Sequence, residues 1–306
     1  VRAHSYRFYC EKLKGNAKVY DVCEGLGNSI FVGTSEGVYE MKYGSDSFVN
    51  VLPNLANSEN LFAVGHLLYI GAREGLFLYD GKKARKINMG KRAKLDYLPR
   101  HFAQDKQGNI WFDTRYSLCC YNPKTDKLVS KQITKQMPYN SLLAKFALCG
   151  NKVFVGTTSN GLFCMDMRTM NIHQVEGVGD MTSSIEVVDG TKLYVTTRGD
   201  GVFVLDANTE KVLWHYGTME DGEYLLPTNR AECYLRVSDG VDWFGVSRYG
   251  AIYSYYNSHL FHTYSYGAFS TRHMDVYGFL KHGSERLIGL QNGFWYVNEE
   301  KNIVKF

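Results

Sequence analysis

The sequence predicts an all-β fold, a seven-bladed β-propeller built from four-stranded antiparallel blades. The first observation is a unit of strand, glycine-centred turn, apolar strand, second glycine and aromatic strand that recurs seven times along the chain. The second is its period of about 43 residues, which suits four short strands with their turns. The third is that apolar and polar residues alternate within the units, whereas the 3.6-residue period of an amphipathic helix is almost absent.

The second strand of each unit is the easiest part to align. In chain order the seven segments are 30–34 (IFVGT), 68–72 (LYIGA), 110–114 (IWFDT), 153–157 (VFVGT), 193–197 (LYVTT), 242–246 (DWFGV) and 287–290 (LIGL). Another glycine follows a few residues later in every copy except the third, where Ser117 stands. We expect this glycine to supply the positive φ that a tight hairpin needs.

Composition and charge suit such a fold. A chain of 306 residues would ordinarily suggest two domains, but a propeller of this length closes into one unit, so we expect a single domain over residues 1–306. The hydrophobic fraction of 44% is sufficient for a core, and the 23 tyrosines suit the packing of pleated sheets. The net charge of +4 provides no strongly basic stripe for nucleic acid. No apolar run approaches the roughly 20 residues that a membrane-spanning helix needs.

Both ends of the chain carry a segment that reads as an outermost strand, 5–10 (SYRFYC) and 302–306 (NIVKF). One blade cannot easily use both. We expect the N-terminal segment to close the ring, because closure removes exposed sheet edges. Residues 302–306 would then lead into a second propeller of a longer protein.

The cysteines and histidines show no metal-ligand spacing. The seven cysteines are Cys10, Cys23, Cys119, Cys120, Cys149, Cys164 and Cys233. None forms a C-x-x-C pair, so we interpret most of them as small buried hydrophobic residues, and one incidental disulfide stays open. The histidines, His173 and His215 among them, are scattered. We therefore expect neither a metal site nor a cofactor.

The third copy carries a family resemblance. Its segment 105–114 (DKQGNIWFDT), followed by YNPKT at 121–125, closely resembles the repeat of the two-component regulator propeller family. The other copies match more loosely, through pairs such as Gly156-Thr157. Two residues depart from the pattern, because Asp113 and Thr196 stand where the family usually has glycine.

The resemblance implies an extracytoplasmic sensor. Family members are periplasmic sensor regions of hybrid two-component systems of gut Bacteroidetes. Typically two seven-bladed propellers precede an immunoglobulin-like domain, one membrane span and a histidine kinase. Such sensors recognise glycan breakdown products and control transcription of glycan-utilisation genes. By this resemblance the chain is a non-enzymatic sensor fragment without catalytic residues, because the sequence shows no kinase motif, membrane span or DNA-binding helix pair.

The same resemblance implies the partners. The ligand would be an oligosaccharide, and the neighbouring propeller and immunoglobulin-like domain of the same protein would pack beside this domain. The full-length protein would form a homodimer. This domain would contact no nucleic acid, and the membrane would be reached only through a segment outside this chain.

Arginines at equivalent places in the repeat predict where a ligand would bind. The turn after the second strand lies on the same face of a blade as the loop that enters the next blade, so these positions would share one rim. The candidate ligand-binding residues in the turns are Arg73, Arg115, Arg198 and Arg248, of which the last stands one residue later than the others. Those in or beside the loops are Tyr97, Arg100, His101, Tyr139, Tyr224, Arg230, Arg272 and His273. Guanidinium groups suit carboxylates and sulfates, so we hypothesise a rim that binds an acidic oligosaccharide.

Three alternatives stay open. The arginines could form a solvated charge pattern or pair with acidic residues of neighbouring loops. Those acidic residues are Asp96, Glu220, Asp221, Glu223 and Asp275. The chain could instead be a polysaccharide lyase or glycosidase, in which His101 or His273 with a nearby tyrosine acts on a uronic acid, although no paired carboxylates are visible. It could also be a protein-interaction scaffold.

Overall fold

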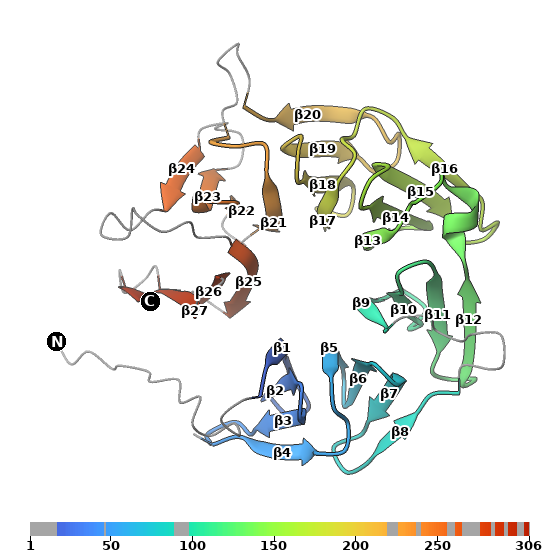
Figure 1. The fold of residues 1–306 in the computed structure, drawn as a ribbon, viewed down its shortest axis with the longest axis vertical. Helices are drawn as coiled ribbons and strands as arrows, with labels where there is room; N and C mark the ends of the chain where they lie inside the picture. The colour runs from blue at the N-terminus through green and yellow to red at the C-terminus, as the bar shows by residue number, and fades with distance from the viewer. Residues whose placement is uncertain are drawn as a thin grey trace. The chain divides into compact units, whose positions relative to one another are not determined.

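In the computed structural model the chain has an all-β propeller fold. Seven four-stranded antiparallel sheets follow one another in chain order (Figure 1). The structure describes residues 17–45, 47–88, 98–218, 226–236, 240–255, 261–264, 276–282, 285–290, 293–298 and 303–305. The chain divides into two compact units, residues 1–132 and 133–306, and each is described by itself.

Unit 1 contains the first three sheets. The first sheet consists of β1 (Val19–Gly25), β2 (Ser29–Thr34), β3 (Gly37–Met41) and β4 (Val49–Leu52). The second consists of β5 (Ser58–Val64), β6 (Leu67–Ala72), β7 (Gly75–Tyr79) and β8 (Ala84–Lys86). The third consists of β9 (Arg100–Gln104), β10 (Ile110–Asp113), β11 (Leu118–Asn122) and β12 (Lys127–Lys131).

Unit 2 begins with the short 3-10 helix η2 (Ile133–Gln136) and contains four sheets. The fourth sheet consists of β13 (Leu143–Cys149), β14 (Lys152–Thr157), β15 (Leu162–Asp166) and β16 (Ile172–Val175). The fifth consists of β17 (Thr182–Val188), β18 (Lys192–Thr197), β19 (Val202–Asp206) and β20 (Val212–Tyr216). The sixth consists of β21 (Ala231–Arg236), β22 (Val241–Val246), β23 (Gly250–Tyr255) and β24 (Phe261–Tyr264). The seventh consists of β25 (Val276–His282), β26 (Glu285–Leu290), β27 (Gly293–Asn298) and β28 (Ile303–Lys305).

The predicted second strands are confirmed, since they coincide with β2, β6, β10, β14, β18, β22 and β26 to within a few residues. They carry much of the core, which lies between neighbouring sheets. In unit 2, for example, Phe154 of the fourth sheet and Val195 of the fifth are fully buried in one apolar cluster. The first strands of successive sheets also pack against each other within each unit, such as β1 against β5 and β17 against β21.

Glycine recurs near the end of the second strands because the next sheet passes too closely for a side chain. A Cβ atom at Gly71 would collide with the carbonyl oxygen of Pro99, which immediately precedes the first strand of the third sheet. The later glycine of the repeat has the positive φ expected of it, for example +79° at Gly201. The two glycines of the sequence pattern therefore serve different steric needs.

Each first strand begins with a bulge. Near the start of that strand in all seven sheets, the register with the second strand shifts. The residues skipped in six of the sheets are Tyr20, Glu59, Ala144, Ser183, Glu232 and Tyr277. In the third sheet, His101 and Phe102 both lie between the paired residues Arg100 and Ala103. A bulge redirects one side chain out of the alternation of the strand.

The two ends of the chain are expected to compete for one blade. Strand β28 pairs with β27 and is the fourth strand of the seventh sheet. That residues 302–306 lead into a second propeller of a longer protein stays a prediction. Residues 5–10, expected to close the ring, lie outside the described residues. Ring closure by that segment and the single domain over residues 1–306 stay predictions.

Two further findings concern cysteines and helices. The six cysteines that the structure describes have free thiols, and Cys10 lies outside the described residues. No helix in the described part of the chain is long and apolar enough to cross a membrane.

Candidate functional site

The hairpin between the second and third strands of a sheet meets the loop that enters its first strand, and we call this side of each sheet the hairpin edge. In four sheets the residue after the second strand donates its backbone N–H to a carbonyl just before the first strand. These bonds are Ser35 to Lys18, Thr158 to Leu142, Arg198 to Met181 and Ser247 to Arg230, at 2.8–3.0 Å. The hairpin also reaches the next sheet, because the N–H of Gly201 donates to the carbonyl of Asn229 at 2.7 Å. The turns and entering loops therefore converge, as the repeat predicts.

The four turn arginines all lie in hairpins at this edge and are exposed. Arg73 and Arg115 belong to unit 1, whereas Arg198 and Arg248 belong to unit 2. The recurring backbone bond places Ser247, and not Arg248, at the position equivalent to Arg198. That the four guanidinium groups share a single rim stays a prediction.

Two of the predicted arginines, Arg198 and Arg230, converge on a buried carboxylate. The Nε atom of Arg198 donates to Oε2 of Glu232, and the Nε atom of Arg230 donates to Oε1, each at 2.9 Å. The side chain of Glu232 is 5% exposed, whereas the two arginine side chains are 53% and 51% exposed. In each arginine, Nε donates the hydrogen bond to the carboxylate. The Nη atoms of the two arginines form no hydrogen bond with another of the described residues.

The bulge explains how Glu232 reaches these arginines. Arg198 follows β18 in the fifth sheet, Arg230 precedes β21 of the sixth sheet, and Glu232 is the residue skipped at the start of β21. A carboxylate with so little exposure is costly unless it is paired, and two guanidinium groups compensate it here. The cluster retains one net positive charge at the hairpin edge.

A second predicted pair, Arg100 and His101, meets the carboxylate of Asp113 in unit 1. The Nη2 atom of Arg100 donates to Oδ2 at 2.8 Å, and Nδ1 of His101 lies 2.8 Å from Oδ1. The side chain of Asp113 is 1% exposed. His101 is one of the bulge residues and has a positive φ of 43°. Asp113, which departs from the family pattern, therefore holds two candidate residues in place.

The other departure, Thr196, behaves in the same way. Its hydroxyl lies 2.9 Å from the Oγ atom of Ser183, the bulge residue of the fifth sheet. The Ser183 hydroxyl in turn donates to the carbonyl of Ala231, at the start of the sixth sheet. In both departures, a polar side chain at the usual glycine position contacts the bulge of its own sheet.

The remaining candidates are placed in part. Tyr139 lies in the loop entering the fourth sheet and is 91% exposed. Tyr97, Tyr224, Arg272 and His273 lie outside the described residues. The acidic loop residues weighed as arginine partners, Asp96, Glu220, Asp221, Glu223 and Asp275, also lie outside them. The partners of the placed arginines, Glu232 and Asp113, belong to strands and not to loops.

A buried polar network near the other ends of the strands joins the fifth and sixth sheets. Asp242 accepts hydrogen bonds from Nε and Nη2 of Arg236 at 2.7 and 2.8 Å and from the Tyr234 hydroxyl at 2.6 Å. Tyr234 stacks on Tyr194 of the fifth sheet, with ring centroids 4.3 Å apart. Burial raises the pKa of Tyr234 far above its ordinary value. Burial alone would lower the pKa of Arg236, but its hydrogen bonds with Asp242 outweigh burial and raise it. This network fixes the two sheets that carry Arg198, Arg230 and Glu232.

Comparisons with known proteins give the fold. No family model matches the chain, and no curated protein matches its sequence. Among solved structures, YCF48 from Cyanidioschyzon merolae is 13% identical with a TM-score of 0.69, over 94% of this chain and 97% of that one. Virginiamycin B lyase from Staphylococcus aureus is 9% identical with a TM-score of 0.67, over 90% and 92% of the two chains.

A third structure is the extracellular domain of BT4673 from B. thetaiotaomicron, which its name assigns to a hybrid two component system. It is 12% identical with a TM-score of 0.62, and the match covers 95% of this chain and 48% of that one. The chain therefore spans about half the length of this structure. At these identities the likenesses show the fold alone. The chain has a β-propeller fold, and its membership in the two-component regulator propeller family stays a prediction.

Proposed function

We propose that this chain is a periplasmic sensor propeller of a hybrid two-component system. It binds an acidic breakdown product of a glycan at its hairpin edge and controls glycan-utilisation genes through a kinase outside this chain. The observation that carries the proposal is the pair Arg198 and Arg230 held on buried Glu232. The resemblance of the third repeat and the propeller likeness to the extracellular domain of BT4673 are consistent with it.

The arginine pair suits an anionic sugar because its orientation is fixed before a ligand arrives. Each guanidinium is anchored through Nε to the same carboxylate, so its Nη atoms remain for a ligand. Fixed, fork-shaped donors bind carboxylate and sulfate groups through two hydrogen bonds at once, and prior anchoring lowers the entropic cost of binding. Uronic acids and sulfated sugars carry these groups.

The site also offers a way to transmit a signal. Arg198 belongs to a hairpin of the fifth sheet and Arg230 to the loop entering the sixth, so one ligand would bridge two sheets. A ligand shifts the equilibrium between two domain arrangements only by its different affinity for each. A ligand bound at this edge could also contact a neighbouring domain, and it would then favour the arrangement in which both contacts form.

Calorimetric titration with uronic-acid and sulfated oligosaccharides, beside their neutral counterparts, tests the proposal. Arg198→Gln and Arg230→Gln should each weaken binding of the acidic ligand about 10-fold or more, because a charge-assisted hydrogen bond contributes about 1.5–3 kcal/mol. Arg168→Gln is the matched control, because Arg168 is exposed in a turn at the opposite edge of the fourth sheet. The double variant Arg115→Ala with Arg198→Ala tests the wider rim. Unchanged affinity in all the site variants, or no saturable binding of any acidic glycan, would show the proposal to be wrong.

A second candidate function, elimination at a uronic acid by a lyase, is favoured by the contact between His101 and Asp113. A buried carboxylate that binds one ring nitrogen fixes the orientation of an imidazole, as in sites where histidine acts as a general base. Turnover assays on the same glycans separate the two functions. Unsaturated product that disappears in His101→Gln supports the lyase, whereas saturable binding without product supports the sensor.

A further inference from the structure

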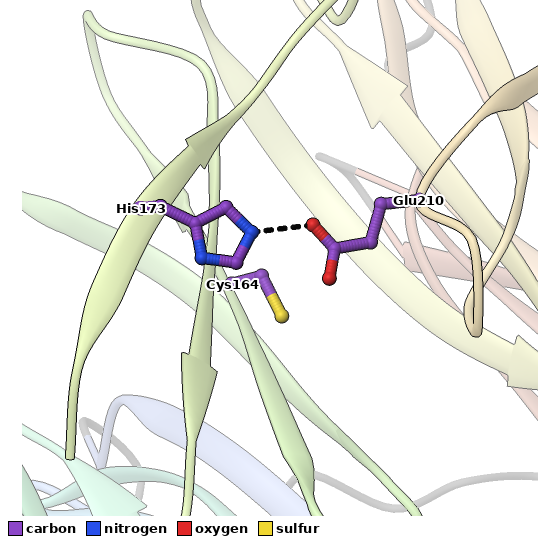
Figure 2. A group of neighbouring side chains, drawn as sticks. All are labelled: Cys164, His173 and Glu210. Atoms are coloured by element: carbon purple, nitrogen blue, oxygen red, sulfur yellow. Dashed lines mark hydrogen bonds and ion pairs between the residues drawn. The ribbon is translucent and has the colours of Figure 1, made fainter. Parts of the chain in front are cut away.

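Three side chains with metal-ligating atoms meet between the fourth and fifth sheets, on the side opposite the hairpin edge (Figure 2). Cys164 of β15 and His173 of β16 are directly paired in register. Glu210 ends the turn that joins β19 to β20 in the next sheet. One ligand atom from each residue lies within 4.8 Å of the others, and Nε2 of His173 lies 2.6 Å from Oε2 of Glu210.

The equivalent place between the second and third sheets has different chemistry. There, Leu78 and Arg85 are the register pair that corresponds to Cys164 and His173. Asp126 ends the corresponding turn with a φ of 53°, close to the 61° of Glu210.

Nη1 of Arg85 lies 3.0 Å from Oδ1 of Asp126, and its Nη2 donates to the Tyr121 hydroxyl at 3.0 Å, so an ion pair and a hydrogen bond join the outer strand to the next sheet there. That structural task needs neither a thiol nor an imidazole. Between the fourth and fifth sheets, all three positions carry side chains that can ligate a metal.

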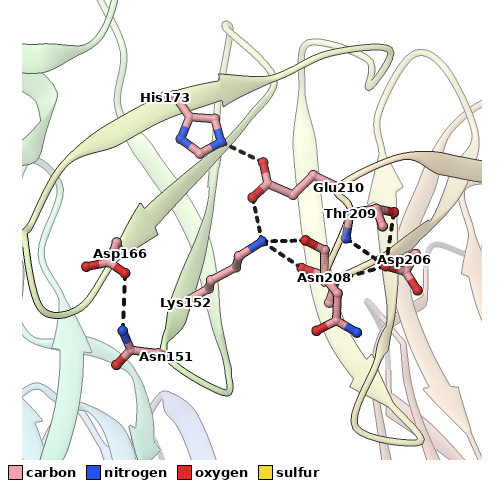
Figure 3. A network of polar contacts seen from close by, with 9 residues as sticks. Asn151, Lys152, Asp166, His173, Asp206, Asn208, Thr209 and Glu210 are labelled. Carbon is pink, nitrogen blue, oxygen red and sulfur yellow. Dashed lines mark hydrogen bonds and ion pairs between the residues drawn. The ribbon is translucent and has the colours of Figure 1, made fainter.

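Lys152 orients the carboxylate of this group (Figure 3). Its Nζ atom donates to Oε1 of Glu210 at 2.7 Å and to the carbonyls of Ala207 and Asn208 at 3.1 and 2.8 Å. Oε1 is thus occupied, and Oε2 is the oxygen that faces His173. Such outer contacts fix the direction of a metal-binding carboxylate.

We propose that Cys164, His173 and Glu210 form a binding site for a zinc ion. Thiolate, imidazole and carboxylate are the three donor types that Zn²⁺ accepts, whereas Mg²⁺ and Ca²⁺ require oxygen ligands. Three protein ligands leave the fourth tetrahedral position for water. The side chain of His173 is 60% exposed, so the ion can enter from solvent.

Binding is an exchange of protons for the metal. The thiol proton of Cys164 leaves to solvent as the Sγ–zinc bond forms. The proton between Nε2 of His173 and Oε2 of Glu210 leaves, and the neutral imidazole carries its one proton on Nδ1 instead. Nε2 and Oε2 then bond to the ion in place of their hydrogen bond. Two anionic ligands and the nearby Lys152 ammonium leave one net positive charge with Zn²⁺ bound. The ion would link the outer strand of the fourth sheet to the fifth, as the ion pair of Arg85 and Asp126 does elsewhere.

The test uses residues 1–306 freed of metal by a chelator and dialysed against Zn²⁺ alone. We expect one bound equivalent. With Co²⁺ in place of Zn²⁺, we expect the near-ultraviolet charge-transfer band of a cobalt–thiolate bond. Cys164→Leu and His173→Arg introduce the residues found at the equivalent places in the second sheet, so the fold should be retained. Each should weaken Zn²⁺ binding more than about 100-fold, because loss of an outer contact alone costs 10–100-fold.

Cys120→Ser is the control, since Cys120 lies in the third sheet and should affect neither the stoichiometry nor the cobalt spectrum. Thermal unfolding provides a second measurement, because a ligand that binds only the folded state raises the midpoint. Zinc should raise the midpoint of the wild type and not that of His173→Arg. The proposal is wrong if the wild type binds no zinc, if its cobalt form lacks the thiolate band, or if Cys164→Leu and His173→Arg bind zinc as tightly as the wild type.

Discussion

Replacing Asp242 by asparagine tests how the fifth and sixth sheets are held together. The carboxylate accepts two hydrogen bonds from Arg236 and one from Tyr234. The side chains of Arg236 and Asp242 are 16% and 6% exposed, so water cannot replace these bonds. Asparagine has the same shape, but its amide N–H group would face the donor groups of Arg236 or Tyr234 in place of an acceptor oxygen. The guanidinium would lose its main counterion.

The expected loss can be worked out from these contacts. Removing one partner of a buried ion pair costs about 3–5 kcal/mol. We expect the lower end, about 3 kcal/mol, because Arg236 keeps a contact of 3.2 Å with Asp189. If the free energy of unfolding falls by about 3 kcal/mol per molar urea, the urea concentration at the unfolding midpoint should fall by about 1 M. Trp214 and Trp243 lie in the two sheets, so their fluorescence reports the transition of unit 2.

Asp189→Asn is the matched control. It contacts the same arginine, but its side chain is 62% exposed, and an exposed pair contributes about 0–1 kcal/mol. Its midpoint should therefore move by about 0.3 M at most. Equal shifts for Asp242→Asn and Asp189→Asn would refute the reasoning, because burial would then make no difference.

Three further predictions concern pH, packing and thiol reactivity. The folded state lowers the pKa of Glu210 from its ordinary value of 4.5, so this group stabilises the fold above that pH and loses its contribution as pH falls through the folded pKa. The difference in urea midpoint between the wild type and Glu210→Gln should shrink below about pH 4.5, and a difference unchanged at about pH 3 would contradict this. Gly71→Ala should destabilise the protein by about 1–3 kcal/mol in urea unfolding, because its Cβ would collide with the Pro99 carbonyl. Gly278→Ala, where a Cβ meets nothing within 4 Å, should be nearly neutral, and equal losses would exclude the steric explanation. Burial raises the pKa of the Cys119 thiol to about 12, so iodoacetamide should label it far more slowly in the folded protein than in urea, as measured by peptide mass spectrometry. Similar labelling rates in both states would contradict that burial.

The fold could be predicted because its constraints are local and repeated. The glycine near the end of the second strand, as at Gly71, reflects a collision with the next sheet that recurs at Gly33, Gly156 and Gly245. The later glycine, as at Gly201, reflects a backbone angle that other residues avoid. Both signals stand at fixed places in the repeat. The sequence alone therefore locates the seven second strands.

The candidate site was only partly predictable, because its acidic members depend on a register shift. The alternation of inward and outward side chains along a strand does not indicate that Glu232 faces the arginines. The direction of its side chain follows from the bulge in β21, which the sequence does not reveal. The sequence pointed to acidic residues of the loops, whereas the partner Glu232 stands in a strand, two residues after Arg230. The departure at Asp113 was visible in the sequence, but its contacts with His101 and Arg100 were not.

Other features were hidden for different reasons. Cys164 and His173 are opposite each other only because of the pairing of β15 with β16, and Glu210 comes from another sheet. No spacing rule along the chain describes such a group. The pairing of residues 303–305 with β27 was also not predicted, because segments with the same pattern stand at both ends of the chain.

The recurring bulge gives each first strand one position, near the hairpin edge, that lies outside the strand's alternation. Its residue can reach neighbours by polar contacts, as Ser183 does with the carbonyl of Ala231 in the sixth sheet. The seven sheets already differ at this position, with Tyr20, Glu59, His101, Ala144, Ser183, Glu232 and Tyr277. If the hairpin edge binds a ligand as proposed, exchanges of this one residue would alter the contacts offered to that ligand sheet by sheet.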